Sequence, residues 1–99
     1  MTVTSTLNEQ SLLDIVCQAA AIVMDVPAGE LDGKTRLIDD LSADSLALIE
    51  IVEVTEDFLR AAGTSVRVDD GTLARLTTLG ELVAALRDEV AGQRSETEV

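Results

Sequence analysis

The amino-acid sequence predicts an all-α protein: a four-helix bundle with a long loop between the first and second helices and a short third helix. Apolar residues recur at spacings of three and four along three long segments, which is the period of an amphipathic helix. The first and the last of these segments also begin with the residue pair of a capping box. The alternation typical of strands is confined to SVRV at 65–68, which is too short to pair alone.

The first helix is expected over about 7–24. Thr6 and Glu9 fit a capping box at its start, in which each side chain bonds the other residue's backbone N–H. Pro27 limits its end, because the residue before a proline disfavours helical angles. The apolar residues expected on or beside its inward face are Leu12, Ile15, Val16, Ala19, Ile22 and Val23.

The second helix is expected over about 45–62, and Gly63 is a natural stop after it. One of its faces is apolar, whereas another carries acidic residues at helical spacing. The residues expected to face inward are Leu48, Ile51, Val52, Phe58 and Leu59.

The last two helices differ in length. A short third helix is expected near 72–76. The fourth and longer helix follows Thr78, which forms a second capping box with Glu81. The residues expected to face inward are Leu79, Leu82, Val83, Leu86 and Val90.

The connection over 25–44 is expected to have little secondary structure of its own. Loops of this length are uncommon in compact domains unless they serve a function. The apolar residues expected to pin it to the bundle are Leu31, Leu37, Ile38 and Leu41. It leads the chain directly to Ser45, at the start of the second helix.

The length of 99 residues indicates one domain, 1–99, with flexible ends at about 1–5 and 92–99. An apolar fraction of 46% supports a folded core despite a net charge of -12. The single cysteine, Cys17, is expected to be a small buried hydrophobe. The chain shows neither a signal peptide nor an apolar run long enough to span a bilayer, so a soluble cytoplasmic protein is expected. We also expect it to be a monomer.

The acidic charge and the scarcity of aromatic residues exclude several classes of partner. Nucleic acids require clustered Lys and Arg, and single strands also require aromatic rings for stacking, whereas Phe58 is the only aromatic residue. Anionic membrane surfaces are disfavoured by the same charge. Partner enzymes with basic docking surfaces are favoured instead.

The sequence contains partial matches to two binding-site motifs, a phosphate-binding loop and a calcium-binding loop. The segment GELDGKT has three residues between Gly29 and Gly33 where a phosphate-binding loop needs four. The acidic alternation over 40–44 resembles the start of a calcium loop, which needs glycine at its sixth position and glutamate at its twelfth. Ser45 and Ile51 occupy those positions, so no metal site is expected.

Ser45 stands where a polar turn becomes an apolar helix. The chain contains no histidine to activate this hydroxyl, and Glu50 and Glu53 are better interpreted as solvated surface charge than as general bases. An enzyme is therefore not expected. Either Asp44 or Ser45 can cap the helix, and the positive end of a long helix also favours a phosphate attached to Ser45.

The stretch LSADSLALIEIVEVTEDFL at 41–59, with TLGELVAAL at 78–86, resembles the acyl carrier protein family over about residues 7–91. The resemblance implies an acyl-carrier-like bundle in which Ser45 bears 4′-phosphopantetheine, transferred from coenzyme A by a phosphopantetheinyl transferase. Acyl or polyketide intermediates would ride on the arm as thioesters. The protein would present them to a ketosynthase, an acyltransferase or another biosynthetic enzyme, and would perform no chemistry itself.

The resemblance also implies roles for the residues around Ser45. Asp44 would orient the loop and assist the transferase, and Leu46 and Ile49 would be apolar contacts beside the arm. The recognition surface for basic patches on partner enzymes would consist of Asp39, Asp40, Ile49, Glu50, Glu53 and Asp57.

Three positions depart from the family's usual pattern. Ser42 stands where the family usually has glycine, Glu53 where an apolar residue is often found, and Thr55 where an aliphatic core residue is expected. These departures favour a discrete carrier of a specialised, polyketide-like pathway over a housekeeping fatty-acid carrier. Two alternatives stay open: a peptidyl carrier protein of nonribosomal peptide synthesis, and an unmodified acidic helical interaction module in which Ser45 is only a cap.

Overall fold

A computed structural model describes residues 8–98, with side chains described for residues 8–91. Its elements are the helices α1 (Glu9–Met24), α2 (Ser45–Ala61), α3 (Asp70–Leu73) and α4 (Leu79–Glu98), together with the 3-10 turn η2 (Ala28–Glu30). The described residues form no strand, and a single isolated bridge joins Arg36 to Thr78. The predicted all-α fold with a short third helix is therefore confirmed.

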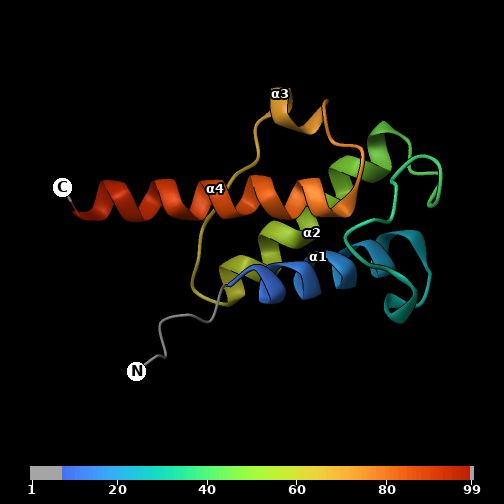
Figure 1. The fold of residues 1–99 in the computed structure, drawn as a ribbon, viewed down its shortest axis with the longest axis horizontal. Helices are drawn as coiled ribbons and strands as arrows, with labels where there is room; N and C mark the ends of the chain where they lie inside the picture. Colours follow the sequence, from blue (N-terminus) through green and yellow to red (C-terminus); the bar gives the residue numbers. More distant parts are fainter. Residues whose placement is uncertain (1–7, 99) are drawn as a thin grey trace.

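Helix α1 is the centre of the bundle, because it packs against both α2 and α4. Figure 1 shows α2 crossing the bundle obliquely and α3 lying at its edge. The connection over 25–44 lies at the end of the molecule where α2 begins. The largest fully buried side chains come from the three long helices and from that connection: Leu12, Val16, Leu37, Ile51, Thr55, Leu59, Leu79, Leu82 and Leu86.

Helix α1 begins at Glu9 because Asn8 caps it, accepting the N–H of Ser11 at its Oδ1 at 2.8 Å. The predicted capping box is wrong: Glu9 is the first helical residue, and Thr6 lies outside the described residues. The inward face is largely as predicted, but Ile22 is 61% exposed. Ile22 lies roughly 80° around the helix axis from Leu12, at the edge of the apolar stripe.

Helices α3 and α4 differ from their predicted bounds. Helix α3 starts two residues earlier than predicted because Asp69 caps it, accepting the N–H of Thr72 at 2.9 Å. Helix α4 extends to Glu98, into the segment predicted as a flexible end. The hydroxyl of Thr78 accepts the N–H of Glu81 at 3.1 Å, as a capping box requires, but the Glu81 carboxylate accepts the N–H of Thr77 instead, at 2.7 Å.

The connection between α1 and α2 is more ordered than predicted. The N–H groups of Leu37 and Gly80 donate to the carbonyls of Thr77 and Gly33, each at 2.9 Å. These bonds fasten the connection to the start of α4. Leu37 is 1% exposed, whereas its neighbour Ile38 is 70% exposed, so the expectation that Ile38 pins the loop is wrong. Adjacent residues in this turn face opposite ways, and Leu37 takes the inward position.

A buried hydroxyl and a buried thiol are both accommodated in the core. Thr55 is fully buried, and its hydroxyl donates to the carbonyl of Ile51 one turn earlier, at 2.8 Å. Cys17 is buried as predicted, and burial, reinforced by the charges of Asp14 and Asp32, raises the pKa of its thiol. Within the described part of the chain, none of the helices is both long and apolar enough to cross a bilayer.

Candidate functional site

Ser45 is the first residue of α2, and its side chain is exposed. Asp44 is the cap: its Oδ1 accepts the N–H of Ala47 at 2.8 Å, and its carbonyl accepts the N–H of Leu48 at 2.9 Å. The structure thus decides between the two capping candidates in favour of Asp44. No residue of the described range forms a hydrogen bond with the Ser45 hydroxyl, which is left accessible at the surface.

The start of α2 favours a negative group. The N–H groups of Ser45 and Leu46 precede the helix's own hydrogen-bond ladder and point out of its end. The helix is 17 residues long and has no acidic side chain in its first turn. An anionic group on the Ser45 oxygen would therefore meet free N–H donors and the positive end of the macrodipole.

The backbone that delivers Ser45 is held in a defined turn. The N–H groups of Ser42 and Ala43 donate to the carbonyls of Ile38 and Leu37, each at 2.9 Å. Ser42 has a φ of 57°, in the left-handed region that glycine adopts freely. A glycine at this position would satisfy the turn without strain, whereas the serine costs about 1–2 kcal/mol. The turn that a glycine would suit is thus retained here by a strained serine.

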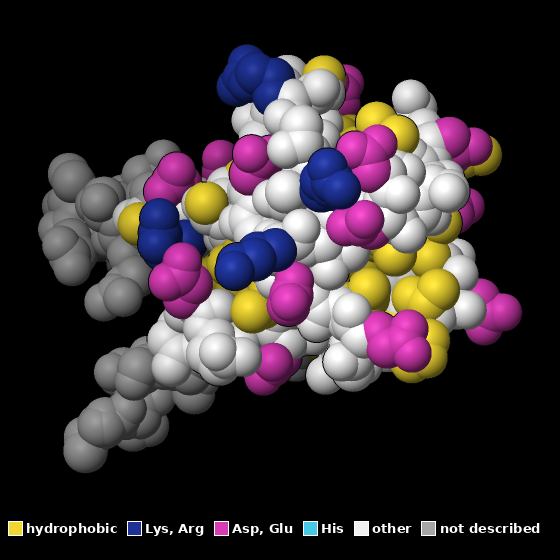
Figure 2. Space-filling model, turned by 45° about the vertical axis from the view of Figure 1, so that its right-hand side comes forward, with side chains coloured by type: hydrophobic (Ala, Val, Ile, Leu, Met, Phe, Trp, Pro, Cys, Tyr) yellow, Lys and Arg dark blue, Asp and Glu magenta, His cyan; other side chains and the backbone are white. Residues whose placement is uncertain are grey.

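Exposed apolar side chains surround Ser45. Leu46 is 64% exposed and Ile49, one turn further along α2, is 39% exposed, as expected for contacts beside an attached group. Ile38, whose carbonyl binds the N–H of Ser42, is also exposed. Figure 2 shows hydrophobic and acidic side chains side by side on the right of this face, at the end that carries the connection. The sequence analysis did not predict Ile38 as a surface residue, because an apolar residue in this loop was expected to pack against the bundle.

The predicted acidic residues fall into two groups. Glu50 and Glu53 share one exposed face of α2 with Leu46, at helical spacings of four and seven, and neither carboxylate forms an ion pair within the described residues. Asp57 continues that face but pairs with Arg60 at 2.8 Å. Glu50 and Glu53 are therefore the exposed carboxylates of α2 without an ion pair among the described residues, whereas Glu56 is half-buried and accepts the N–H of Val68 at 3.0 Å.

Asp39 and Asp40 share a basic partner, Arg36, which the sequence analysis did not single out. The Arg36 guanidinium lies 3.3 Å from the carboxylate of Asp39 and 3.8 Å from that of Asp40. The Asp40 carboxylate also accepts the backbone N–H of Arg36 at 2.8 Å. Asp40 thereby closes the turn that leads to Ser45, in addition to contributing charge.

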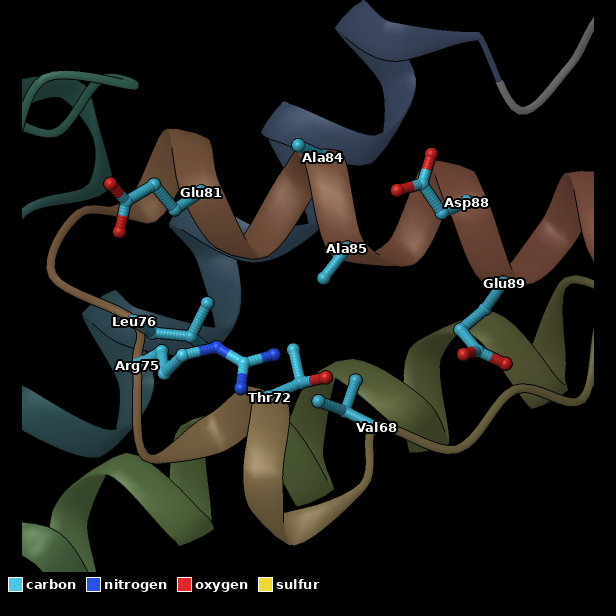
Figure 3. Close-up of a pocket in the computed structure, with 9 residues that line it drawn as sticks. All are labelled: Val68, Thr72, Arg75, Leu76, Glu81, Ala84, Ala85, Asp88 and Glu89. Atoms are coloured by element: carbon cyan, nitrogen blue, oxygen red, sulfur yellow. The ribbon is translucent and has the colours of Figure 1, made fainter.

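Helices α3 and α4 border a second surface feature, a groove of about 410 Å³. In Figure 3 the Arg75 side chain reaches into it beside Thr72, below the small side chains of Ala84 and Ala85 on α4. None of the predicted site residues lines this groove. The described residues also bring together no group of three or more side chains able to hold a metal ion.

Residues 12–86 match the model of a protein family described as the phosphopantetheine attachment site. The chain is 35% identical over 94 residues to the acyl carrier protein of Streptomyces coelicolor, covering 94% of this chain and 97% of that protein. It is 30% identical over 81 residues to the acyl carrier protein of Shigella flexneri, covering 81% of this chain and 91% of the relative. The meromycolate extension acyl carrier protein of Mycobacterium tuberculosis is 32% identical over 81 residues, covering 82% of this chain and 66% of that protein.

Proposed function

Because the chain belongs to the acyl carrier proteins, we propose that Ser45 is the residue that bears its 4′-phosphopantetheine arm. As a member of this family, the protein tethers acyl groups as thioesters on the thiol of that arm. It is a carrier and not a catalyst. It works with a phosphopantetheinyl transferase, which installs the arm, and with the biosynthetic enzymes that load and use the acyl group.

The observation that carries the proposal is that Asp44, and not Ser45, caps α2. Asp44 caps α2, so the Ser45 hydroxyl is exposed and is not held by any described residue. This oxygen can form the bond to the phosphorus nearest the pantetheine of coenzyme A while the adenosine bisphosphate portion leaves. The hydroxyl proton passes to a base of the transferase, because no described residue of this chain accepts a hydrogen bond from the Ser45 hydroxyl and the Asp44 carboxylate is occupied by the N–H of Ala47.

The N-terminal end of α2 also suits the product of that reaction. The phosphodiester formed on Ser45 carries a negative charge, and the N–H groups of Ser45 and Leu46 are free to face it. Leu46 and Ile49 offer exposed apolar surface beside the arm. The fit of these groups to a phosphopantetheine supports Ser45 over other hydroxyls of the chain.

Partner enzymes, in our proposal, dock on the face that surrounds Ser45. Glu50 and Glu53 supply its unpaired charge, with Leu46 and Ile49 as apolar contacts. Such exposed charges raise encounter rates and select partners more than they raise affinity, which suits a carrier that must be released after each transfer. A ketosynthase or an acyltransferase with a basic docking surface is the kind of partner expected, and the carrier is expected to act as a monomer.

We further propose that the carrier serves a specialised, polyketide-like pathway. The support is the departure of Ser42 and Thr55 from the usual pattern of the family, with a strained turn at the first and a buried hydroxyl at the second. Assaying the loaded carrier with ketosynthases of both kinds of pathway tests this assignment. Faster transfer to a fatty-acid ketosynthase than to a polyketide one would overturn it.

The attachment proposal is tested by incubating the protein with coenzyme A, magnesium and a broad-specificity phosphopantetheinyl transferase. Intact-mass measurement should show the gain of one phosphopantetheine, and Ser45→Ala should show none. A wild-type chain that gains nothing with several transferases would instead support the unmodified interaction module.

A further inference from the structure

A cation is built into the otherwise acidic segment that precedes Ser45. Arg36 is exposed, and its guanidinium lies between the carboxylates of Asp39 and Asp40, at 3.3 and 3.8 Å. Opposite charges this close largely cancel each other's field at a distance. The two aspartates therefore offer an approaching partner much less negative charge than the sequence alone suggests.

The backbone fixes Arg36 in this place. Arg36 forms the isolated bridge with Thr78 at the start of α4, and the next residue, Leu37, is buried and donates its N–H to Thr77. The carbonyl of Arg36 accepts the N–H of Asp40 at 3.0 Å, while the Asp40 carboxylate accepts the N–H of Arg36. The position of this cation is thus set by the fold.

A further hydrogen bond joins the segment of Arg36 to the turn that precedes Ser45. The carbonyl of Leu37 accepts the N–H of Ala43 at 2.9 Å. Arg36 and Asp44 are the neighbours of these two bonded residues, and Ser45 follows Asp44. We therefore expect a partner that docks around Ser45 to extend over Arg36 and the exposed side chain of Ile38.

We propose that Arg36 is a specificity-determining residue of the docking surface, and that the surface carries charges of both signs. The partner it fits presents basic residues opposite Glu50 and Glu53 and a patch with little positive charge opposite Arg36, because one arginine against two aspartates leaves only a single negative charge there. A partner that is basic throughout gains less at this point than the two aspartates alone would give it, because Arg36 repels its basic residues. This inference rests on the proposed function, since it concerns docking that leads to Ser45.

The chain offers a matched control at the other end of α2. Arg60 is 62% exposed in its side chain, compared with 59% for Arg36, and it also pairs with an aspartate, Asp57. Replacing either arginine by glutamine or glutamate changes the net charge of the protein equally. Any difference between the two sites therefore reports position and not total charge.

The test measures kcat/KM for arm transfer from coenzyme A by a phosphopantetheinyl transferase whose docking face is basic throughout, over a range of salt concentrations. Arg36→Gln and Arg36→Glu should raise kcat/KM, by about threefold to tenfold for the glutamate at low salt, with the gain shrinking as salt screens it. Arg60→Gln and Arg60→Glu should change it by less than about twofold. Equal effects at the two arginines, or slower loading of the Arg36 variants, would overturn the inference.

A second arm uses transferase variants in which single basic docking residues are replaced by glutamate. For at least one of them, the wild-type carrier should be loaded faster than Arg36→Glu, reversing the order seen with the unmodified transferase. The absence of any reversal contradicts a charge of mixed sign at this surface. Circular dichroism of each variant checks the fold. Complete loading of the wild type upholds the proposed function whatever the Arg36 result, whereas no loading of any variant overturns both.

Discussion

The carbonyl oxygen of Gly33 accepts a hydrogen bond from the N–H of Gly80 at 2.9 Å, and a Cβ atom on Gly80 would lie only 2.7 Å from that same oxygen. This close approach holds the connection between α1 and α2 against the start of α4. From the sequence, Gly33 was interpreted only as part of an incomplete phosphate-binding motif, and no role was predicted for Gly80. In the structure their shared role is to let two backbones meet.

Gly80→Ala should therefore destabilise the protein. Displacing the Gly33 backbone costs about 1–3 kcal/mol, which outweighs the gain of up to about 1 kcal/mol from placing alanine in a helix. Gly33→Ala is the matched control, because its Cβ would meet its nearest neighbour at 3.7 Å, an ordinary contact. Urea unfolding followed by circular dichroism compares them, and equal losses of stability in both variants would show that the close approach is not the cause.

Ser42→Gly should stabilise the protein. Ser42 adopts a left-handed backbone conformation that costs about 1–2 kcal/mol, and glycine adopts it without that cost. Glycine also has more conformational freedom in the unfolded chain, which lowers the stability by about 0.5–1 kcal/mol. A net gain of about 0.5–1 kcal/mol is expected in the free energy of unfolding. Ser42→Ala keeps the Cβ and the strain, so it should give no gain. If the alanine variant is stabilised as much as the glycine variant, the strain at position 42 is not real.

The periodic segments of the sequence predicted the three long helices and most of their buried faces correctly. This succeeded because a helix is specified locally, by spacing and by flanking residues. The starts of the helices were predicted less accurately, because several neighbouring polar residues are able to act as the cap. Asn8 caps α1 in place of the predicted Thr6, and Asp69 starts α3 ahead of the predicted bounds.

The connection over 25–44 shows what local patterns cannot reveal. Its order comes from backbone bonds to the start of α4, which is distant in sequence, and so the burial of Leu37 and the exposure of Ile38 followed from no periodicity. The same holds for the site. The motif around Ser45 located the start of α2, but the pairing of Arg36 with Asp39 depends on a turn whose shape the sequence did not predict.

Glu81 should make the stability of the protein depend on acid pH. Hydrogen bonds from the backbone N–H and the hydroxyl of Thr77 lower the pKa of this carboxyl below its ordinary value of 4.5. The unfolded chain therefore binds a proton at a higher pH than the folded chain does. The stabilisation is fully present above the unfolded pKa and is lost as the pH falls through the folded one.

Unfolding measured from pH 7 down to about pH 3 tests this with Glu81→Gln. The free energy of unfolding should be lower in the variant than in the wild type at pH 7, and the difference should shrink as the pH falls below about 4.5. Glu89→Gln, on the same helix and without a hydrogen-bond partner among the described residues, should show no such difference. A gap at Glu81 that is independent of pH would contradict the role of its charge.

Glu50→Lys combined with Glu53→Lys should impair acyl transfer to partner enzymes while leaving the fold intact. Both carboxylates are exposed and form no ion pair with any described residue, and exposed charges contribute about 0–1 kcal/mol each to stability. A loss of about tenfold in transfer rate at low salt is expected, with little change in the circular dichroism spectrum. Asp88→Lys with Glu89→Lys changes the charge equally on α4. Equal losses in the two double variants would assign the effect to net charge and not to the α2 face.

The account depends on one oxygen atom, and the most direct measurement locates the arm on the chain. After loading from coenzyme A, the protein is digested and its fragments are sequenced by tandem mass spectrometry, with Ser42 and Ser65 as internal comparisons. We predict that the phosphopantetheine lies on Ser45, that Ser42 and Ser65 are unmodified, and that Ser45→Ala remains unloaded. An arm found on another residue, or an alanine variant that still gains the mass, would contradict it.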